Sequence, residues 1–206
     1  PAVASDTQIS WEWGTNQPQD VRLNYGDQLQ AHGRWSADGP GRLGVHFGPD
    51  PAVLPAEAVT QITGTLPVVA MDALDGGQGA QQLPWVDRLP PLASVNVELA
   101  GIDIARWRIA TTQVSAEVDD NLWQLRLDGA AAGQGQWRPS PQRQLTLDLT
   151  RLVVDRRPDL DARAAQADDN APSALANPTQ RPSIDLQADT FIAAGSTLGQ
   201  LDFALT

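Results

Sequence analysis

Two histidines, His32 and His46, are the side chains with the widest range of possible chemistry. Each lies on the polar phase of an alternating segment, and no third ligand stands at a spacing that would complete a metal site. The stretch Asp72-x-x-Asp75-Gly76-Gly77 lacks the alternating oxygen ligands and the final glutamate of a calcium loop. The sequence therefore predicts exposed histidines on strands, no metal site and no cofactor.

Groupings that could catalyse a reaction are also missing from the pattern. Ser196 stands in Gly-Ser-Thr-Leu-Gly, which is not the spacing of a nucleophile elbow. The glycines of Gly76-Gly77-Gln78-Gly79 open no long helix, so they offer no helix N-terminus to a phosphate. A glycosidase with two distant carboxylates stays open, although the chain holds only four glutamates. We interpret the protein as one that is not an enzyme.

Seven tryptophans, against one tyrosine and three phenylalanines, are the unusual feature of the composition. Trp11, Trp35 and Trp123 run in phase with neighbouring aliphatic residues, which favours packing in a core. Three others stand near expected turns: Trp85, Trp107 and Trp137. Exposed aromatic rings on a β-sandwich can stack on sugars, whereas an open apolar sheet face can hold acyl chains. Both functions fit this composition.

The charge balance excludes one class of partner. The 206 residues carry a formal net charge of −11, and all 14 basic residues are arginine. Nucleic-acid binding depends on neutralising phosphates with basic side chains, and this chain has no basic stripe. Nucleic acid is therefore not an expected partner. The absence of cysteine excludes disulfides and thiolate chemistry.

The elements that must position any functional group are β-strands. Apolar and polar residues alternate with a period of two, which is typical of strands with one apolar and one wetted face in antiparallel sheets. The clearest alternating segments are 21–25, 29–35, 43–47, 95–99, 123–127, 145–149 and 201–205. The best helical candidate is a short turn at 69–74. The predicted fold class is all-β and antiparallel, built of repeated hairpins, with at most short helices.

Glycine and proline mark where these segments end. Tyr25-Gly26-Asp27 and Asp38-Gly39-Pro40-Gly41 predict hairpin turns. Residues 155–182 lack periodicity and are rich in Ala, Asp, Asn and Pro, which predicts a long mobile loop. The chain begins without methionine and ends inside an alternating run. We therefore interpret residues 1–206 as a single β-rich segment of a longer repetitive protein.

A weak internal repeat occurs at an offset of 89 residues. Its first copy is Val95, Val97, Leu99, Ile102, Ile109 and Val114, and its second is Ile184, Leu186, Ala188, Phe191, Leu198 and Phe203. A Gly-x-Trp phrase recurs separately, as Gly33-Arg-Trp35 and Gly135-Gln-Trp137. Recurring hairpins of this kind predict a sheet that grows by adding similar units.

Several phrases are familiar as a set. They include Val21-x-Leu-x-Tyr-Gly-Asp27, Ile62-x-Gly-x-Leu66-Pro-Val-Val-Ala-Met-Asp-Ala73, Val95-x-Val-x-Leu99-x-x-Ile102, Leu145-x-Leu-x-Leu149-x-x-Leu152 and Ile184-Asp-Leu-Gln-Ala-Asp189. The set resembles the C-terminal half of YhdP-like proteins of Gram-negative bacteria, in the AsmA-like group that also holds TamB. One departure is Asp75-Gly-Gly-Gln-Gly, where the family continues as an apolar helix.

The resemblance implies an elongated, U-shaped β-groove in the periplasm, anchored in the inner membrane by parts outside this segment. Such proteins are regarded as bridges that move phospholipid toward the outer membrane, and the family has no catalytic residues to carry over. The expected partners are phospholipid acyl chains, and the expected location is periplasmic. A carbohydrate-binding β-sandwich module of an exported protein is the alternative, and a purely structural β segment is a third.

The alternation independently supplies the apolar floor that acyl chains need. In-phase residues of each strand point to one side, and hairpins place the strands next to each other. The predicted groove lining is Val95, Val97, Leu99, Trp123, Leu125, Leu127, Leu145, Leu147, Leu149, Ile184, Leu186, Phe203 and Leu205.

Overall fold

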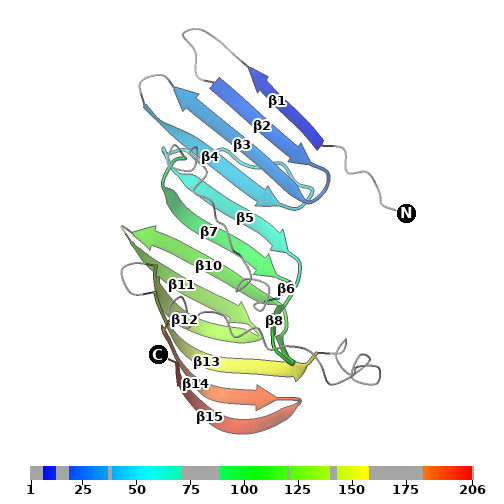
Figure 1. Ribbon diagram of the computed structural model, residues 1–206, viewed down its shortest axis with the longest axis vertical. Coiled ribbons are helices and arrows are strands. Elements are labelled where there is room, and N and C mark those ends of the chain that lie inside the picture. The colour runs from blue at the N-terminus through cyan, green and yellow to red at the C-terminus, as the bar shows by residue number, and fades with distance from the viewer. Residues whose placement is uncertain are drawn as a thin grey trace, which may run out of the picture. The chain divides into compact units, whose positions relative to one another are not determined.

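The computed structural model is all-β, and most of its strand pairs are antiparallel, which confirms the predicted fold class (Figure 1). The structure describes residues 7–12, 19–36, 39–70, 89–119, 121–139, 143–157 and 183–205, and no helix occurs among them. The chain divides into two compact units. Unit 1 holds residues 1–66, 80–98 and 115–118, and unit 2 holds residues 67–79, 99–114 and 119–206.

Unit 1 is a sheet in which strands follow chain order. Its strands are β1 (Thr7–Glu12), β2 (Gln19–Tyr25), β3 (Leu29–Ser36), β4 (Gly39–Phe47), β5 (Thr60–Leu66) and most of β7 (Leu92–Leu99). The first four pair antiparallel with their neighbours. The predicted turn after Tyr25 is confirmed, because Gly26 has φ 53° and Gln28 N donates to Tyr25 O at 3.2 Å.

Most of the second predicted turn of unit 1 is strand instead. Gly39 and Gly41 lie in β4, whereas the residue before them, Asp38, lies outside the described residues. The indole of Trp35 explains the glycines, because a Cβ at Gly41 or at Gly33 would clash with that ring. The ring of this Gly-x-Trp phrase thus lies over two glycines of adjacent strands, and they leave it room.

Unit 2 is built around a long strand, β13 (Gln144–Arg156). Its other strands are β6 (Val69–Ala70), β8 (Ile102–Ile104), β9 (Trp107–Ile109), β11 (Leu122–Gly129), β12 (Ala131–Arg138), β14 (Ser183–Ala193) and β15 (Ser196–Leu205). β11, β12 and β13 pair antiparallel, and β15 pairs antiparallel with β14. The last residues of β13 also pair with β9. β10 (Thr112–Asp119) is divided between the two units.

The antiparallel prediction does not hold for every strand pair. β4 with β5, β6 with β8 and β13 with β14 are parallel. Each pair is separated in sequence by more than a tight turn, and a longer connection can return the chain to the end where it started. The connection between β13 and β14 contains most of the predicted loop 155–182. Asp155 and Arg156 of that loop belong to β13, and residues 158–182 lie outside the described residues.

The prediction of a helical turn at 69–74 is wrong for its first two residues. Val69 and Ala70 make the short strand β6, because they pair with Ile102 and Asp103 of β8. Val69 N also donates to Gly101 O at 2.9 Å. Residues 71–74 lie outside the described residues.

A β-bulge explains the x-x spacing between Leu149 and Leu152. On β12, Gly133 pairs with Leu149 and Ala132 pairs with Arg151, so Thr150 has no opposite residue. The bulge accommodates Thr150 as an extra residue and thereby turns Leu149 and Leu152 to the same side of the sheet. Both leucines then join one buried cluster with Ala131 and Ala188. β14 keeps the same spacing, since Ala188 and Phe191 pair with Leu149 and Leu152.

The 89-residue repeat places two hairpin turns at corresponding positions. Ala105, between β8 and β9, has φ 50°, and Ala194, between β14 and β15, has φ 49°. These are the non-glycine residues with positive φ among those described, and 194 minus 105 is 89. A positive φ at the first turn residue matches the twist of two-residue hairpins. The repeat is therefore structural as well as sequential.

A buried ion cluster fixes the β8–β9 hairpin to the end of β13. Arg108 Nε and Nη2 donate to the two carboxylate oxygens of Asp103 at 2.6 and 2.9 Å. Arg157 Nε lies 3.3 Å from Asp103 Oδ2, and Arg157 N donates to Arg106 O at 3.0 Å. Only 4% of Asp103 is exposed. The carboxylate is therefore a counter-ion shared by two partly buried guanidinium groups.

Replacing Asp103 with alanine would leave both guanidinium groups without their buried counter-ion. We expect the free energy of unfolding to fall by roughly 3 kcal/mol, measured by urea unfolding. The control is Asp185→Ala on the exposed polar side of β14, where the loss should stay within about 0.5 kcal/mol. Equal losses in the two variants would contradict a structural role for the cluster.

Candidate functional site

Ten of the thirteen predicted lining residues come together on one side of unit 2. The cross-strand registers of β11 to β15 place them in three rows. The first row is Trp123, Trp137, Leu145, Ile184 and Leu205. The second is Leu125, Gly135, Leu147, Leu186 and Phe203, and the third is Leu127, Gly133, Leu149, Ala188 and Leu201. We call these three rows the apolar face of unit 2.

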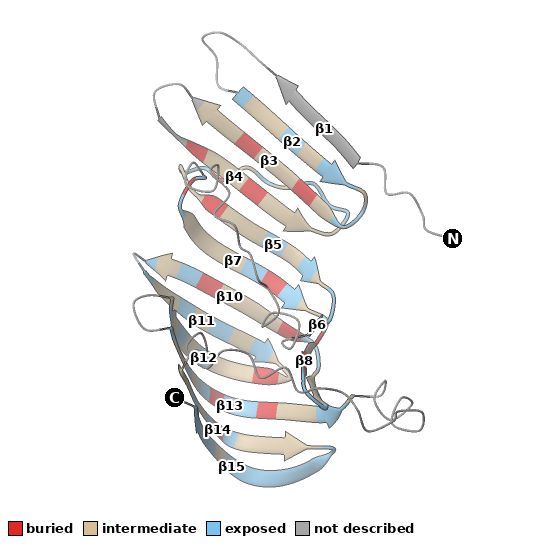
Figure 2. Cartoon of the chain, in the orientation of Figure 1, coloured by how far each residue is buried: buried red, intermediate tan, exposed pale blue. Residues whose placement is uncertain are grey.

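Burial changes across this face. Leu149 is 1% exposed and Ala188 is 3% exposed, so the third row reaches the core of the unit. Leu125 and Leu147 are half-buried, whereas Phe203 and Leu205 on β15 are 46% and 39% exposed. Figure 2 shows this gradient, with buried segments on β13 and a mostly exposed β15. The face is therefore packed at its centre and open to solvent toward β15.

Glycine and alanine on the central strands shape this face, and alternation alone did not identify them. A Cβ added at Gly135 would lie 2.6 Å from Leu147 Cδ2, so the leucine side chain covers the glycine. Trp137 stands opposite Trp123 and was missed because its strand holds small residues rather than aliphatic ones. Its signal in the sequence is the Gly-x-Trp phrase on the return strand of a hairpin.

Three predicted lining residues are not members of these rows. Val95 and Val97 belong to β7 in unit 1, where Val97 is 4% exposed. Leu99 ends β7 and is assigned to unit 2, but β7 is hydrogen-bonded to β5 and β10, and neither of these strands carries the three rows. The predicted lining residues that share one face are therefore those of β11, β13, β14 and β15.

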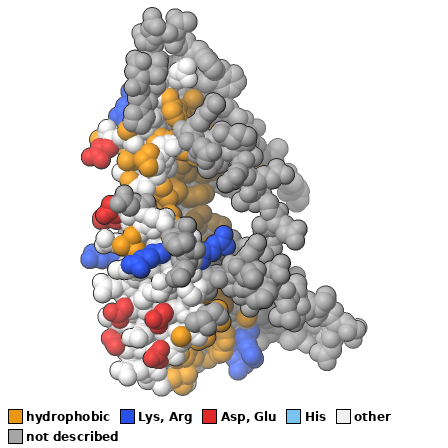
Figure 3. All heavy atoms as spheres, turned by 60° about the vertical axis from the view of Figure 1, so that its left-hand side comes forward, with side chains coloured by type: hydrophobic (Ala, Val, Ile, Leu, Met, Phe, Trp, Pro, Cys, Tyr) orange, Lys and Arg blue, Asp and Glu red, His pale blue; other side chains and the backbone are white. Residues whose placement is uncertain are grey.

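The opposite side of the same strands is polar. Arg126, Gln134, Asp148, Gln187 and Asp202 form one exposed cross-strand row. A shallow pocket of about 340 Å³ lies on this side. In the lower part of Figure 3, acidic side chains stand on a largely polar surface beside gathered hydrophobic ones. Strands β11 to β15 therefore separate an apolar from a wetted side.

In unit 1, a charged cluster crosses β2 and β3. Arg34 donates to both carboxylate oxygens of Asp20, from Nε at 3.0 Å and from Nη2 at 2.6 Å. His32 Nε2 lies 3.2 Å from Asp20 Oδ1. The hydrogen bonds from Arg34, with a smaller contribution from His32, lower the pKa of Asp20 from 3.8 to about 2. The carboxylate is therefore ionised and its acceptor capacity is largely used.

The two histidines occupy separate positions in unit 1. His46 Nδ1 lies 2.9 Å from Thr63 Oγ1 on β5, and His32 contacts Asp20 instead. Among the residues that the structure describes, no three His, Asp or Glu side chains are placed to hold one metal ion. The same residues include no helix that is long and apolar enough to cross a membrane.

Comparisons with protein-family models, with curated proteins and with solved structures find no match to this chain. A function for it must therefore be argued from its own residues.

The low pKa of Asp20 predicts a dependence of stability on acid. Because the folded pKa lies below the unfolded value, the pair stabilises the fold above pH 3.8 and loses that contribution as the pH falls toward about 2. Asp20→Asn cannot titrate. Urea unfolding should therefore show a stability difference between wild type and variant at neutral pH that shrinks across this range. A difference that is constant down to the lower pKa would contradict the ion pair.

The burial gradient of the apolar face predicts unequal costs of truncation. Leu149→Ala should lower the free energy of unfolding by about 3 kcal/mol, because it opens a cavity in the core. Phe203→Ala removes a larger side chain that is half exposed, and should cost no more than about 1 kcal/mol. Urea unfolding of the two variants tests this order. A larger cost for Phe203 would show that the β15 end is closed.

Proposed function

We propose that the apolar face of unit 2 binds the acyl chains of phospholipids, in a YhdP-like protein that moves phospholipid toward the outer membrane. The parent protein would be periplasmic and anchored in the inner membrane by parts outside this segment. The observation that carries the proposal is the continuous apolar face across five strands, with its β15 end exposed. No catalytic step is assigned to the chain.

The physical chemistry of such a face suits a sliding apolar ligand. Burying each methylene of an acyl chain contributes about 0.8 kcal/mol, so entry onto the face is favourable. Leucine and phenylalanine occupy every position of the second row except Gly135, which gives successive positions similar affinity. An acyl chain would therefore not be held at one point of the face. The headgroup of the lipid would remain in water.

The alternative, a carbohydrate-binding sandwich, needs a second sheet to cover the apolar side. In unit 2 the described strands contact one another as hydrogen-bonded neighbours within a sheet. The rings of Trp123 and Trp137 belong to the apolar rows and are half-buried. These observations favour acyl chains over sugars as the ligand of this face.

The test compares two glutamates at adjacent positions of β11. Leu125→Glu places a charge on the apolar face, and Gln124→Glu places the same charge on the exposed side. Phospholipid extracted with the purified protein is measured by mass spectrometry, and binding of a fluorescent phospholipid is titrated. We expect Leu125→Glu to lower lipid binding at least about tenfold, because an unpaired carboxylate on an apolar surface is strongly disfavoured.

The control should bind lipid within about twofold of wild type. Thermal unfolding of both variants checks that they fold. A folded Leu125→Glu protein that binds lipid normally would contradict the proposal for this face. An unfolded one, together with oligosaccharide binding by the lipid-free wild type, would favour a closed sandwich.

A further inference from the structure

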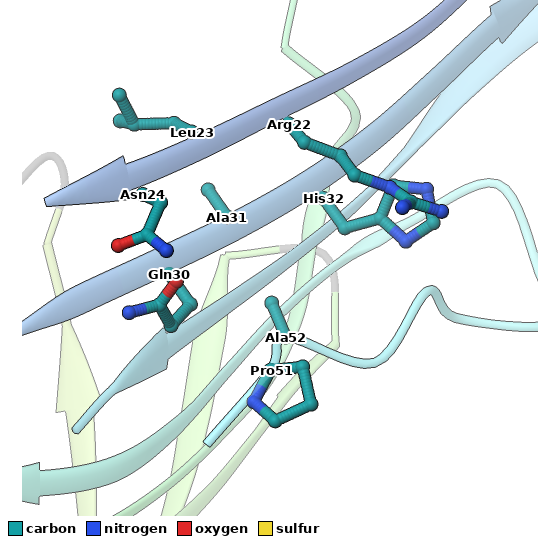
Figure 4. Close-up of a pocket in the computed structure, with 8 residues that line it drawn as sticks. All are labelled: Arg22, Leu23, Asn24, Gln30, Ala31, His32, Pro51 and Ala52. Atoms are coloured by element: carbon teal, nitrogen blue, oxygen red, sulfur yellow. The ribbon is translucent and has the colours of Figure 1, made fainter. Parts of the chain in front are cut away.

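Unit 1 carries a pocket on the side of its sheet opposite the apolar residues. Its volume is about 410 Å³, and its lining is Arg22, Leu23, Asn24, Gln30, Ala31, His32, Pro51 and Ala52. Figure 4 shows the polar side chains of β2 and β3 together with Pro51 and Ala52 from the β4–β5 connection. Arg22 stands directly opposite His32, and Asn24 opposite Gln30. The pocket is therefore lined by a compact group of hydrogen-bonding side chains.

The wall formed by the connection (residues 48–59) is fixed at several points. Arg42 Nη1 donates to Pro55 O at 3.2 Å, and Gly48 N donates to Gln28 O at 3.0 Å. Gly44 of β4 lets the connection approach, because a Cβ there would clash with Val53 O. The pocket thus has a wall held by side-chain and backbone contacts, instead of a free loop.

The charges around this pocket leave a positive group available. Asp20 is occupied by Arg34 and His32, as described above. The side chain of Arg22 is exposed and forms no hydrogen bond or ion pair with another described residue. Asp50, next to the lining residue Pro51, is exposed and likewise pairs with no described cation. The guanidinium of Arg22 is therefore the available charge of the lining, in a chain whose net charge is −11.

We propose that this pocket binds the oxyanion group of a small soluble molecule, a phosphate or a carboxylate. The fork of Arg22 can donate two parallel hydrogen bonds to such a group, and the amide of Asn24 can add another. Gln30 Nε2 donates to Gly26 O at 2.7 Å, which holds its side chain in place at the pocket. Arg22 alternates along β2 with the apolar Val21 and Leu23, so its side chain points to the opposite side of the strand. A lipid whose acyl chains contacted Val21 and Leu23 would therefore not place its headgroup at Arg22. The inference is independent of the proposed lipid function.

The experiment is isothermal titration calorimetry at constant ionic strength with inorganic phosphate, glycerol 3-phosphate, citrate and short-chain phosphatidic acid. The variant Arg22→Gln removes the proposed ligand of the oxyanion. Arg126→Gln removes the same charge from the exposed polar side of unit 2. We expect saturable binding of at least one soluble anion, weakened at least about tenfold by Arg22→Gln and less than twofold by Arg126→Gln.

Asn24→Leu provides a second variant that keeps the net charge and should also weaken binding. Thermal unfolding of the three variants should match wild type, because the altered side chains are exposed. Equal losses in Arg22→Gln and Arg126→Gln would overturn the proposal, since they indicate an effect of net charge. Absence of saturable binding by any soluble anion, or binding of phosphatidic acid alone, would overturn it as well.

Discussion

The in-register pairing of β11 to β15 is the constraint on which the rest of unit 2 depends. Side chains of a strand alternate between its two sides, so a slip of one residue would move every apolar side chain to the wetted side. The register instead aligns Leu125, Leu147 and Leu186 across strands that are both antiparallel and parallel. The continuity of the apolar face is therefore a property of backbone pairing more than of any single side chain.

The bulge at Thr150 extends that constraint along β13. Residues three apart in a regular strand point to opposite sides, so without the bulge Leu152 would point away from Leu149 and the long strand could not contribute to one core over its whole length. Thr150 Oγ1 donates to Ala132 O at 3.1 Å, which supplies a partner at the disrupted point of the ladder. The same spacing in β14 lets Ala188 and Phe191 follow the bulge in parallel register. A local irregularity thus preserves the global alternation.

Alternation in the sequence was sufficient to predict many of the strands and most of the apolar face, because side-chain direction follows from strand geometry alone. It could not predict that β13 and β14 are parallel, because that depends on where a long connection returns the chain. The ion pair of Asp20 with Arg34 could not be predicted either, because the two residues are 14 positions apart in the sequence. They become neighbours only through the register in which β2 and β3 pair. Trp137 was missed because glycines, rather than aliphatic residues, precede it.

The two sides of each strand carry opposite physical demands. An exposed apolar surface such as Phe203 with Leu205 favours association with other apolar groups, including a second protein chain. The acidic residues on the wetted side, among them Asp148 and Asp202, supply net negative charge that opposes contact between like chains but does not repel a neutral acyl chain. Charge on one side of the sheet therefore opposes association of like chains through the open apolar side, which is compatible with the acyl-chain ligand that we propose.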